Sequence, residues 1–406
     1  MSGRAQLGQS VTAVEGENFS GRSELLRLLA NAPGTSVQPG HQADERQNAW
    51  LGIDAHNYLS GLVQTVGAEL ELHGIDDSDR RASVRSLLEP VGLSSLLARN
   101  PLTLSGGEQV VLALATATLA TRDLLAIDCA LEQLSPTVRS HALGVLTALG
   151  HAGVRTVLAD NRLREFRSQV AVASAASLGA PEPRLRPPGL AAARLDDPPA
   201  AESIRLDDVT FRYRKGPAVL RGVSFTFEPG QVYFLKGPNG IGKSTLGKLL
   251  CGLIKPERGA VLDGHGRALR PWRSPGHTVG YHFQNPDLQL FSTSVAQEFA
   301  SGGTDVVAAF GLQECLGAHP HDLPFVLRKR VAVAAAFARR RPWLILDEPI
   351  LGQDDRTALE LAAMLSRVAV GACGLIVITH SEWFRTLVHQ ARILRLTADG
   401  LTEEHV

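Results

Sequence analysis

The sequence repeats itself, and this repeat restricts the possible folds more than any other feature. The segment GENFSGRS at 16–23 aligns with GPNGIGKS at 237–244. Two further pairs of segments lie at nearly the same separation, namely LLAID at 124–128 with WLILD at 343–347, and TVLAD at 156–160 with IVITH at 376–380. Three segments that recur in the same order at one spacing indicate a tandem duplication.

Short apolar runs alternate with helical stretches in both copies. Examples are LLAI at 124–127 and LIVI at 375–378. Bounded apolar runs of this length are typical of strands buried on both faces, which occur in parallel sheets covered by helices. We therefore predict an α/β fold with two lobes in one chain. The segment 168–202 is rich in Ala and Pro, which is typical of a linker, so we expect one lobe at 1–167 and the other at 203–406.

The composition argues against several classes of protein. The chain has 41 basic and 41 acidic residues, which gives no support to nucleic acid or an anionic membrane surface as the main partner. Its four cysteines are far apart, so they indicate neither a zinc site nor a disulfide framework. No secretion signal is visible, and the apolar stretches are shorter than the roughly 20 residues that a membrane span needs. We expect a cytoplasmic chain whose membrane role is peripheral.

The most specific motif is VYFLKGPNGIGKSTLGKLL at 232–250. An apolar strand leads into the pattern GxxxxGK[ST] and then into a helix, which is the context of a phosphate-binding loop. Its glycines let backbone N–H groups close around phosphates at the positive end of the helix. Lys243 supplies charge for the phosphates, and Ser244 offers a hydroxyl to Mg²⁺. The predicted binding residues of this loop are Gly237, Pro238, Asn239, Gly240, Gly242, Lys243, Ser244 and Thr245.

The segments around this loop occur in the order found in ABC (ATP-binding cassette) ATPases. They are LDDVTFRYRKGPAVLRGVSF at 206–225, VGYHFQNPDLQLF at 279–291, WLILDEP at 343–349 and VITHS at 377–381. The second lobe therefore resembles an ABC ATPase from Ile204 to His380. The resemblance implies a mainly parallel sheet with a helical subdomain in each lobe, and an antiparallel β subdomain in the second.

The same resemblance implies ATP and Mg²⁺ as cofactors and assigns roles to further residues. Gln284 would approach Mg²⁺ and the attacking water, and Asp347 would anchor the Mg²⁺ shell. Glu348 resembles the catalytic carboxylate that polarises this water. His380 would lie near the γ-phosphate, and Tyr213 would stack on adenine.

The two lobes differ at the signature segment of this family. The first lobe has LSGGEQ at 104–109, which resembles that signature, whereas the second has LPFVLRKR at 323–330, where a proline has no N–H to donate. Ser105 can cap the following helix, and the N–H groups of Gly106 and Gly107 can bind phosphate. The alternative interpretation of these residues is an ordinary capping box.

The first lobe has lost the residues that handle the nucleotide. Arg22 replaces the lysine of the phosphate loop, Cys129 replaces the catalytic glutamate, and Asp160 replaces the histidine. ABC lobes are expected to pair head to tail, with each ATP between one lobe's phosphate loop and the other lobe's signature. The intact parts then form one hydrolytic composite site from the second lobe and Ser105, Gly106 and Gly107 of the first. The opposite site is degenerate, and whether it binds ATP stays open.

The closest resemblance within the family is carried by QNPDLQLFSTSVAQEFA at 284–300 and GLIKPERGAVLDG at 252–264. These segments are similar to those of the ATPase components of energy-coupling-factor (ECF) transporters, which import vitamins or transition-metal ions. The implied partners are a membrane-embedded coupling protein and a membrane-embedded substrate-binding component, at the inner face of the cell membrane.

Three alternatives stay open at this stage. One is a soluble tandem ABC ATPase acting on ribosomes or nucleic acid, which usually shows basic patches and two good signatures. Another is the ATPase of a different class of ABC transporter. The third is a non-catalytic clamp that uses ATP as a switch, against which Glu348 argues.

Overall fold

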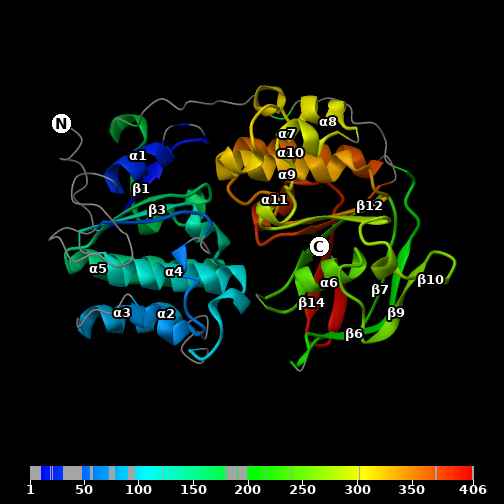
Figure 1. Ribbon diagram of the computed structural model, residues 1–406, viewed down its shortest axis with the longest axis horizontal. Coiled ribbons are helices and arrows are strands. Elements are labelled where there is room, and N and C mark those ends of the chain that lie inside the picture. The colour runs from blue at the N-terminus through cyan, green and yellow to red at the C-terminus, as the bar shows by residue number, and fades with distance from the viewer. Residues whose placement is uncertain are drawn as a thin grey trace. The chain divides into compact units, whose positions relative to one another are not determined.

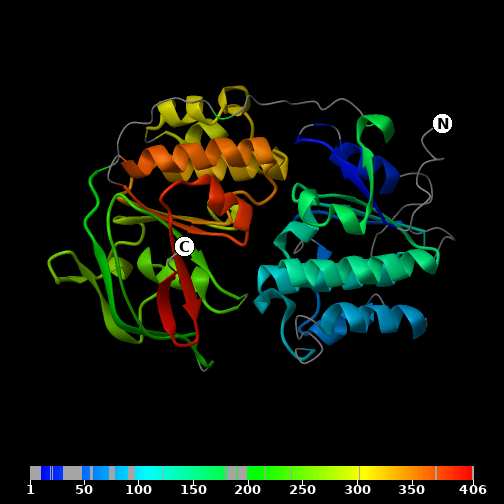
Figure 2. The same ribbon diagram turned by 180° about the vertical axis from the view of Figure 1, so that it is seen from behind.

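The computed structural model describes residues 11–18, 20, 22–30, 48–54, 58–72, 78–89, 97–121, 123–178, 180, 190, 199–214, 216–238, 240–300, 302–370 and 373–404. The chain divides into two compact units, Met1–Arg186 and Pro187–Val406. Figures 1 and 2 show the elements of each unit from opposite sides. Among the described residues, none of the helices is both long enough and apolar enough to cross a membrane.

The first unit is built on one parallel sheet. Its strands are β1 (Val11–Glu15), β2 (Ala49–Leu51), β3 (Leu124–Asp128), β4 (Arg155–Ala159) and β5 (Ala171–Ser174), and its helices are α1 (Arg22–Ala30), α2 (Val66–Leu72), α3 (Ser78–Leu88), α4 (Gly106–Ala120) and α5 (Pro136–His151). The strand order is β2-β3-β4-β1-β5, and every pair is parallel. Helix α1 covers one face of the sheet, α4 and α5 cover the other, and α2 and α3 pack beyond them (Figure 1).

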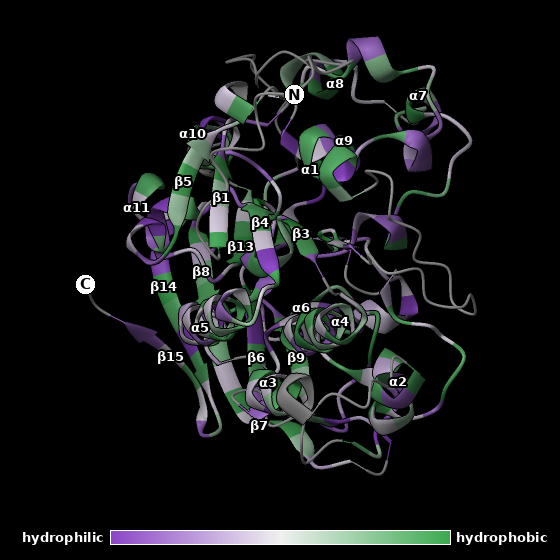
Figure 3. Cartoon of the chain, turned by 90° about the vertical axis from the view of Figure 1, so that its left-hand side faces the viewer, coloured by the Kyte–Doolittle hydropathy of each residue, from purple (hydrophilic) through white to green (hydrophobic). Residues whose placement is uncertain are grey.

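Successive residues of the central strands enter different hydrophobic cores. Ala126 packs with Leu25 and Leu26 of α1, whereas Leu125 and Ile127 belong to the core beneath α4 and α5. This burial on both faces explains why the strand sequences are apolar without alternation. Most residues of helix α4, which Figure 3 shows end-on, are apolar and buried.

The second unit has two sheets. Its strands are β6 (Ile204–Arg212), β7 (Ala218–Phe227), β8 (Val232–Lys236), β9 (Arg258–Asp263), β10 (Ala268–Leu269), β11 (Val279–His282), β12 (Trp343–Asp347), β13 (Gly374–Ile378), β14 (Arg392–Thr397) and β15 (Gly400–Glu404). Its helices are α6 (Lys243–Leu250), α7 (Val295–Glu298), α8 (Thr304–Ala309), α9 (Phe325–Ala338), α10 (Asp355–Val370) and α11 (Glu382–Leu387).

The larger sheet of the second unit has the order β11-β12-β13-β8-β14-β15, in which only the β14–β15 pair is antiparallel. The smaller sheet, β10-β9-β6-β7, is antiparallel. It shares one core with α6 and one face of the larger sheet. The predicted α/β class with two lobes and an antiparallel β subdomain in the second lobe is therefore confirmed.

The first unit continues into the segment expected to be a linker. Strand β5 lies within 168–202 and pairs in parallel with β1, so it forms an edge of the first sheet. The run AVAS is short and rich in alanine, which made it resemble the Ala/Pro-rich sequence around it. Pairing with a neighbouring strand, and not its own sequence, makes this segment a strand.

The carboxyl ends of the parallel strands bring the predicted site residues to one edge of the sheet. In the second unit Asp347 pairs with Ile378, and Ile378 pairs with Leu235. In the first unit Asp128 pairs with Ala159, and Ala159 pairs with Val14. The repeat therefore has the same register in both units, and ligands of such sheets bind beyond this edge.

Candidate nucleotide site

The phosphate loop of the second unit joins β8 to α6, as the sequence predicts. Gly237 has a φ of +154° and Gly242 a φ of +112°. A Cβ atom on Gly237 would lie 2.6 Å from the carbonyl oxygen of Leu396, and one on Gly242 would lie 2.8 Å from a methyl carbon of Val219. Only glycine fits these two positions without strain. Asn239 lies outside the described residues.

Lys243 begins helix α6 and turns back into this loop. Its Nζ donates hydrogen bonds to the carbonyl oxygens of Gly237, at 2.7 Å, and Pro238, at 2.9 Å. Burial lowers the pKa of Lys243, while the carboxylates of Glu348 and Asp347 act in the opposite direction. The ammonium thus lies inside the loop, close to the two predicted acidic residues.

Ser244 and Asp347 form the pair of oxygen donors that Mg²⁺ prefers. The side chains of Ser244 and Asp347 are hydrogen-bonded to each other. Burial raises the pKa of Asp347, and the hydrogen bonds from Tyr281 and Ser244 oppose that rise. These two residues fit a Mg²⁺ site that is completed by phosphate oxygens and water. When bound, the ion would neutralise charge on the phosphates.

Tyr281 is a member of this site that the sequence did not reveal. It lies on β11, and its Oη donates to Oδ2 of Asp347 at 2.7 Å. The Ser244 side chain also forms a hydrogen bond with Tyr281. The only available signal was a tyrosine three residues before Gln284 in an apolar strand, which is equally typical of a core residue.

Glu348 and His380 come together at the ends of β12 and β13. Thr379 Oγ1 donates to Oε2 of Glu348 at 3.0 Å, and the His380 backbone N–H donates to Oε1 at 2.9 Å. The His380 Nε2 lies 3.9 Å from the same Oε1. Glu348 has a φ of +47°, a strained conformation for a residue with a side chain. The carboxylate is therefore held in a fixed direction beside the imidazole.

The remaining predicted residues of the second unit lie around this group. Tyr213 is 47% exposed, and its Oη lies 3.3 Å from Oγ1 of Thr245. Its ring therefore stays available for stacking next to the phosphate loop. Gln284 follows β11, and its carbonyl oxygen accepts a hydrogen bond of 2.6 Å from the buried Nζ of Lys329 in α9. The structure thus fixes the main chain at Gln284.

The signature segment of the first unit forms the N-terminus of α4. Ser105 is the N-cap: its Oγ accepts from the Glu108 N–H at 3.4 Å, and the Ser105 N–H donates to Oε2 of Glu108 at 2.6 Å. This is the capping box that the sequence also allowed. Gly106 and Gly107 occupy the first turn, whose N–H groups have no partner within a helix and suit an anion.

Comparisons with known proteins show the family of this chain. The sequence model of the family described as ABC transporter matches residues 220–351. A relative from Pyrococcus horikoshii, named as an ABC transporter ATP-binding protein, is 34% identical over 192 residues, which are 44% of this chain and 74% of that protein. This chain belongs to the ABC ATPase family. The family hydrolyses ATP.

Two further relatives and one solved structure extend the comparison. A relative from Treponema denticola, also named as an ABC transporter ATP-binding protein, is 33% identical over 211 residues, and this chain spans 42% of its length. The energy-coupling factor transporter ATP-binding protein EcfA of Methanocaldococcus jannaschii is 32% identical over 195 residues, which are 44% of this chain and 70% of that protein. The ABCE1 chain in a model of ribosome-bound archaeal Pelota and ABCE1 matches with a TM-score of 0.68 at 16% identity, over 97% of this chain and 74% of that one. The last match shows a shared fold over both units of this ABC ATPase.

The first unit of this ABC ATPase keeps the backbone of the site but not its chemistry. Cys129 has a φ of +56°, and its N–H donates to the Ala159 carbonyl at 2.8 Å. Glu348 has the same left-handed conformation and donates to Ile378 at the same distance. Burial raises the pKa of the Cys129 thiol well above its usual value, so this side chain is neutral and a poor base.

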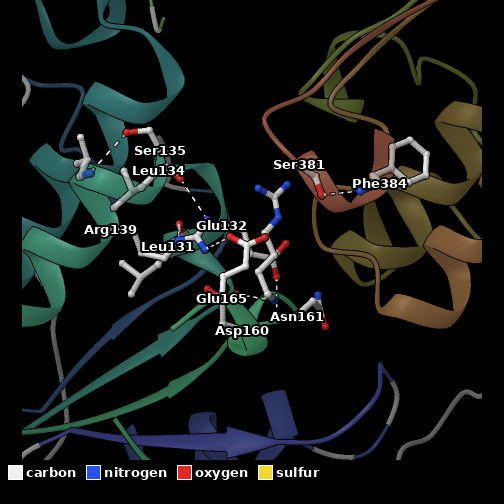
Figure 4. A network of polar contacts seen from close by, with 12 residues as sticks. Leu131, Glu132, Leu134, Ser135, Arg139, Asp160, Asn161, Glu165, Ser381 and Phe384 are labelled. Atoms are coloured by element: carbon white, nitrogen blue, oxygen red, sulfur yellow. Dashed lines mark hydrogen bonds and ion pairs between the residues drawn. The ribbon is translucent and has the colours of Figure 1, made fainter. Parts of the chain in front are cut away.

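Asp160 of this ABC ATPase stands where the second unit has His380. Figure 4 shows Asp160 among its polar neighbours, which include Glu132 and Asn161. The Arg162 N–H donates to Oδ1 of Asp160 at 2.7 Å, and the buried Oδ2 of Asp160 has no hydrogen-bond partner among the described residues. Burial, followed by the neighbouring carboxylate of Glu132, raises the pKa of Asp160 to about 7. An acidic group therefore replaces an imidazole at this position.

Proposed function

We propose that this ABC ATPase hydrolyses ATP at a single composite site. The phosphate loop, Asp347, Glu348 and His380 of the second unit supply the catalytic half, and Ser105, Gly106 and Gly107 of the first unit supply the signature. The observation that carries the proposal is the contrast at one backbone position. There the second unit presents a carboxylate, Glu348, and the first presents a neutral thiol, Cys129.

Each residue of the catalytic half has a task that suits its chemistry. Lys243 and the backbone N–H groups of the loop bind the phosphates. Glu348 orients and polarises the attacking water, with His380 close to its carboxylate and to the γ-phosphate. Tyr213 stacks on the adenine ring. Ser244, Asp347 and Gln284 are the proposed contacts of Mg²⁺ and of its water shell.

Positioning and electrostatics carry most of this reaction. Phosphoryl transfer needs little covalent chemistry from the protein, because charge spreads over the phosphate oxygens in the transition state. Donors fixed before the reaction therefore stabilise that charge without a further reorganisation cost. The first-turn N–H groups of α4 fit this task, because they are preorganised by the Ser105–Glu108 capping box.

We further propose that ATP hydrolysis energises an importer of the ECF type. The likeness to EcfA of Methanocaldococcus jannaschii supports this role. The proposed partners are membrane-embedded subunits, which would hold the chain at the inner face of the cell membrane. The substrate would be chosen by these partners, within the class of vitamins and transition-metal ions.

Both units carry an exposed apolar side chain on equivalent loops, which supports a membrane partner. Leu62 is 77% exposed, and Phe291 is 81% exposed. In each unit a glutamate of the following short helix holds the loop. Glu69 accepts from the Ser60 N–H at 2.6 Å, and Glu298 accepts from the Phe291 N–H at 2.8 Å. The first unit has therefore kept a contact surface while losing its catalytic residues.

The test is ATP hydrolysis by the full chain purified with its membrane partners. Replacing Glu348 by Gln keeps the size of the side chain and removes the charge, so we expect hydrolysis to fall by roughly 100-fold or more while ATP binding persists. Hydrolysis that is absent in the wild-type complex, or unaffected by the substitution, would contradict the proposal. Co-sedimentation with ribosomes in place of membranes would favour a soluble tandem ATPase instead.

A further inference from the structure

The first unit has a phosphate loop whose cation, Arg22, is hydrogen-bonded to the protein through both terminal nitrogens of its guanidinium. We propose that Arg22 determines which of the two loops accepts a nucleotide, by closing the loop of the first unit. One chain then binds one ATP, at the site of the second unit, and this inference rests on the proposed function of that site. In the degenerate site, the Arg22 side chain takes the place of the phosphates.

Arg22 begins α1 at the position that Lys243 occupies in α6. One terminal nitrogen of its guanidinium donates to the Gly16 carbonyl at 2.5 Å. The other donates to Oδ1 of Asn18 at 2.9 Å and to Oδ1 of Asn161, and it lies 3.7 Å from the Cys129 sulfur. A single side chain that is 4% exposed therefore joins the loop after β1 to the ends of β3 and β4.

Lys243 differs from Arg22 in its hydrogen-bond partners. Among the described residues, its hydrogen bonds go to carbonyls of its own loop, so the ammonium can turn towards a phosphate without breaking a hydrogen bond between elements. Arg22 would have to leave Asn161 and Cys129, which lie more than 100 residues away in the sequence. The planar guanidinium with its five N–H groups suits such a multiple contact, and the compact ammonium does not.

The charges around Arg22 also oppose a polyphosphate. Burial disfavours the charge of the guanidinium, but nearby acidic groups, among them Asp128 and Glu132, raise the pKa of Arg22 above its usual value. The positive charge of the guanidinium is therefore already balanced by acidic side chains of the first unit. Bringing ATP here would place its phosphates near those carboxylates and near Asp160, which stands where the second unit has His380.

The first experiment counts bound nucleotide on the full chain. Equilibrium dialysis with Mg²⁺ and the slowly hydrolysed analogue ATPγS should give one nucleotide per wild-type chain and close to none for Lys243→Ala. Two nucleotides per wild-type chain, or one per Lys243→Ala chain, would overturn the proposal that the phosphate loop of the first unit is closed. A failure of the proposed function would give a different result, because ATP hydrolysis would then stay intact in Lys243→Ala.

The second experiment tests the contacts of Arg22 without any nucleotide. Arg22→Ala removes contacts between three elements, so its melting temperature should fall by several degrees, whereas Lys243→Ala should lower it much less. Arg22→Lys should lie between Arg22→Ala and the wild type, because an ammonium can reach one or two of the acceptors. A melting temperature of Arg22→Ala equal to that of the wild type would overturn the proposal.

Discussion

At the scale of single residues, Tyr281 decides how the carboxylate of Asp347 is held. Its hydroxyl donates to Oδ2 of Asp347 at 2.7 Å, next to Ser244. Partners that orient a metal-binding carboxylate typically contribute 10- to 100-fold to metal affinity. We therefore expect Tyr281→Phe to weaken Mg²⁺ binding, so that ATP binding requires a roughly tenfold higher Mg²⁺ concentration than in the wild type. The measurement is a Mg²⁺ titration of ATP binding, alongside kcat and KM.

Tyr233→Phe is the matched control for this prediction. The Tyr233 hydroxyl accepts from the Glu228 N–H at 2.8 Å and from Arg392 at 2.9 Å, on the same sheet but among other partners. Its loss should lower stability and leave the Mg²⁺ titration unchanged. Equal Mg²⁺ titrations of Tyr281→Phe and wild type would show that Tyr281 is only a packing residue.

Asp160 gives the first unit a pH-dependent stability. The folded-state pKa is raised to about 7 from 3.8, by burial and by Glu132, with Arg139 and Arg162 opposing the rise. The unfolded chain releases this proton at lower pH than the folded chain does. Stability is therefore highest below about pH 4 for this group, and it is lost as pH rises through about 7.

We expect Asp160→Asn to flatten that pH dependence. The amide keeps the shape of the side chain and cannot ionise, so the variant should gain more melting temperature relative to wild type at pH 8 than at pH 5. Asp399→Asn, at an exposed position of the second unit, is the control and should follow the wild type at both values. Parallel pH profiles of Asp160→Asn and wild type would refute this assignment.

The sequence alone groups those predicted residues of the second-unit site that follow one another along the chain. Lys243 and Ser244 lie in one loop, and Asp347 and Glu348 end one strand, so motif and neighbouring strand suffice to place them. Tyr281 could not be found this way. It is 66 residues from Asp347 in sequence, and only the parallel pairing of β11 with β12 brings the two together.

At the scale of elements, α4 and α9 are equivalent helices that differ in how their N-termini are capped. Ser105 caps α4 with a capping box, whereas Pro324 precedes α9 and makes no side-chain cap. Lys329 of α9 binds the carbonyl oxygens of Phe283 and Gln284 instead. Helix α9 has thus lost its signature and still fixes the segment at Gln284.

Substitutions at these two N-caps test the composite site. Ser105→Arg breaks the capping box and fills the space in front of the first turn of α4, so hydrolysis should fall by roughly 100-fold or more, as in Lys243→Ala. Pro324→Arg changes the equivalent position of the second unit and should leave hydrolysis near the wild-type rate. Similar losses from both substitutions would mean that both signature segments serve catalysis.

Elements were predictable where their sequence is apolar enough to be buried on two faces. Strands β3, β4, β12 and β13 all match the apolar runs at their expected places. Strand β5 was missed because its four residues include two alanines and are only partly buried at the sheet edge. Its pairing with β1 is a long-range property that local composition does not carry.

At the scale of the whole molecule, the chain has two copies of one fold, for which we propose different tasks. The shared register of Asp128 and Asp347 shows that the first unit has kept its architecture. Its catalytic positions hold Arg22, Cys129 and Asp160, while its signature and its exposed loop at Leu62 are intact. The features retained in the first unit are therefore those that would act on another lobe or on another protein.

Attachment to the membrane should therefore require both units. Leu62→Glu and Phe291→Glu each place a charge on an exposed apolar side chain that is proposed to meet the membrane partner. Because a hot-spot contact contributes about 2 kcal/mol or more to binding, we expect each substitution to reduce the membrane-bound fraction by roughly tenfold or more. The measurement is the fraction of tagged chain that sediments with membranes, and separately the ATP hydrolysis of the unbound chain.

Leu28→Glu and Leu253→Glu are the matched controls, because these leucines are 60% and 48% exposed in the first and second unit and lie away from the two loops. Both controls should sediment as the wild type does. Hydrolysis by the unbound chain should be unchanged in all four variants, since none of these side chains belongs to the proposed nucleotide site. If Leu62→Glu stays fully membrane-bound while Phe291→Glu is released, only the second unit contacts the partner. The first unit would then be retained for its signature alone.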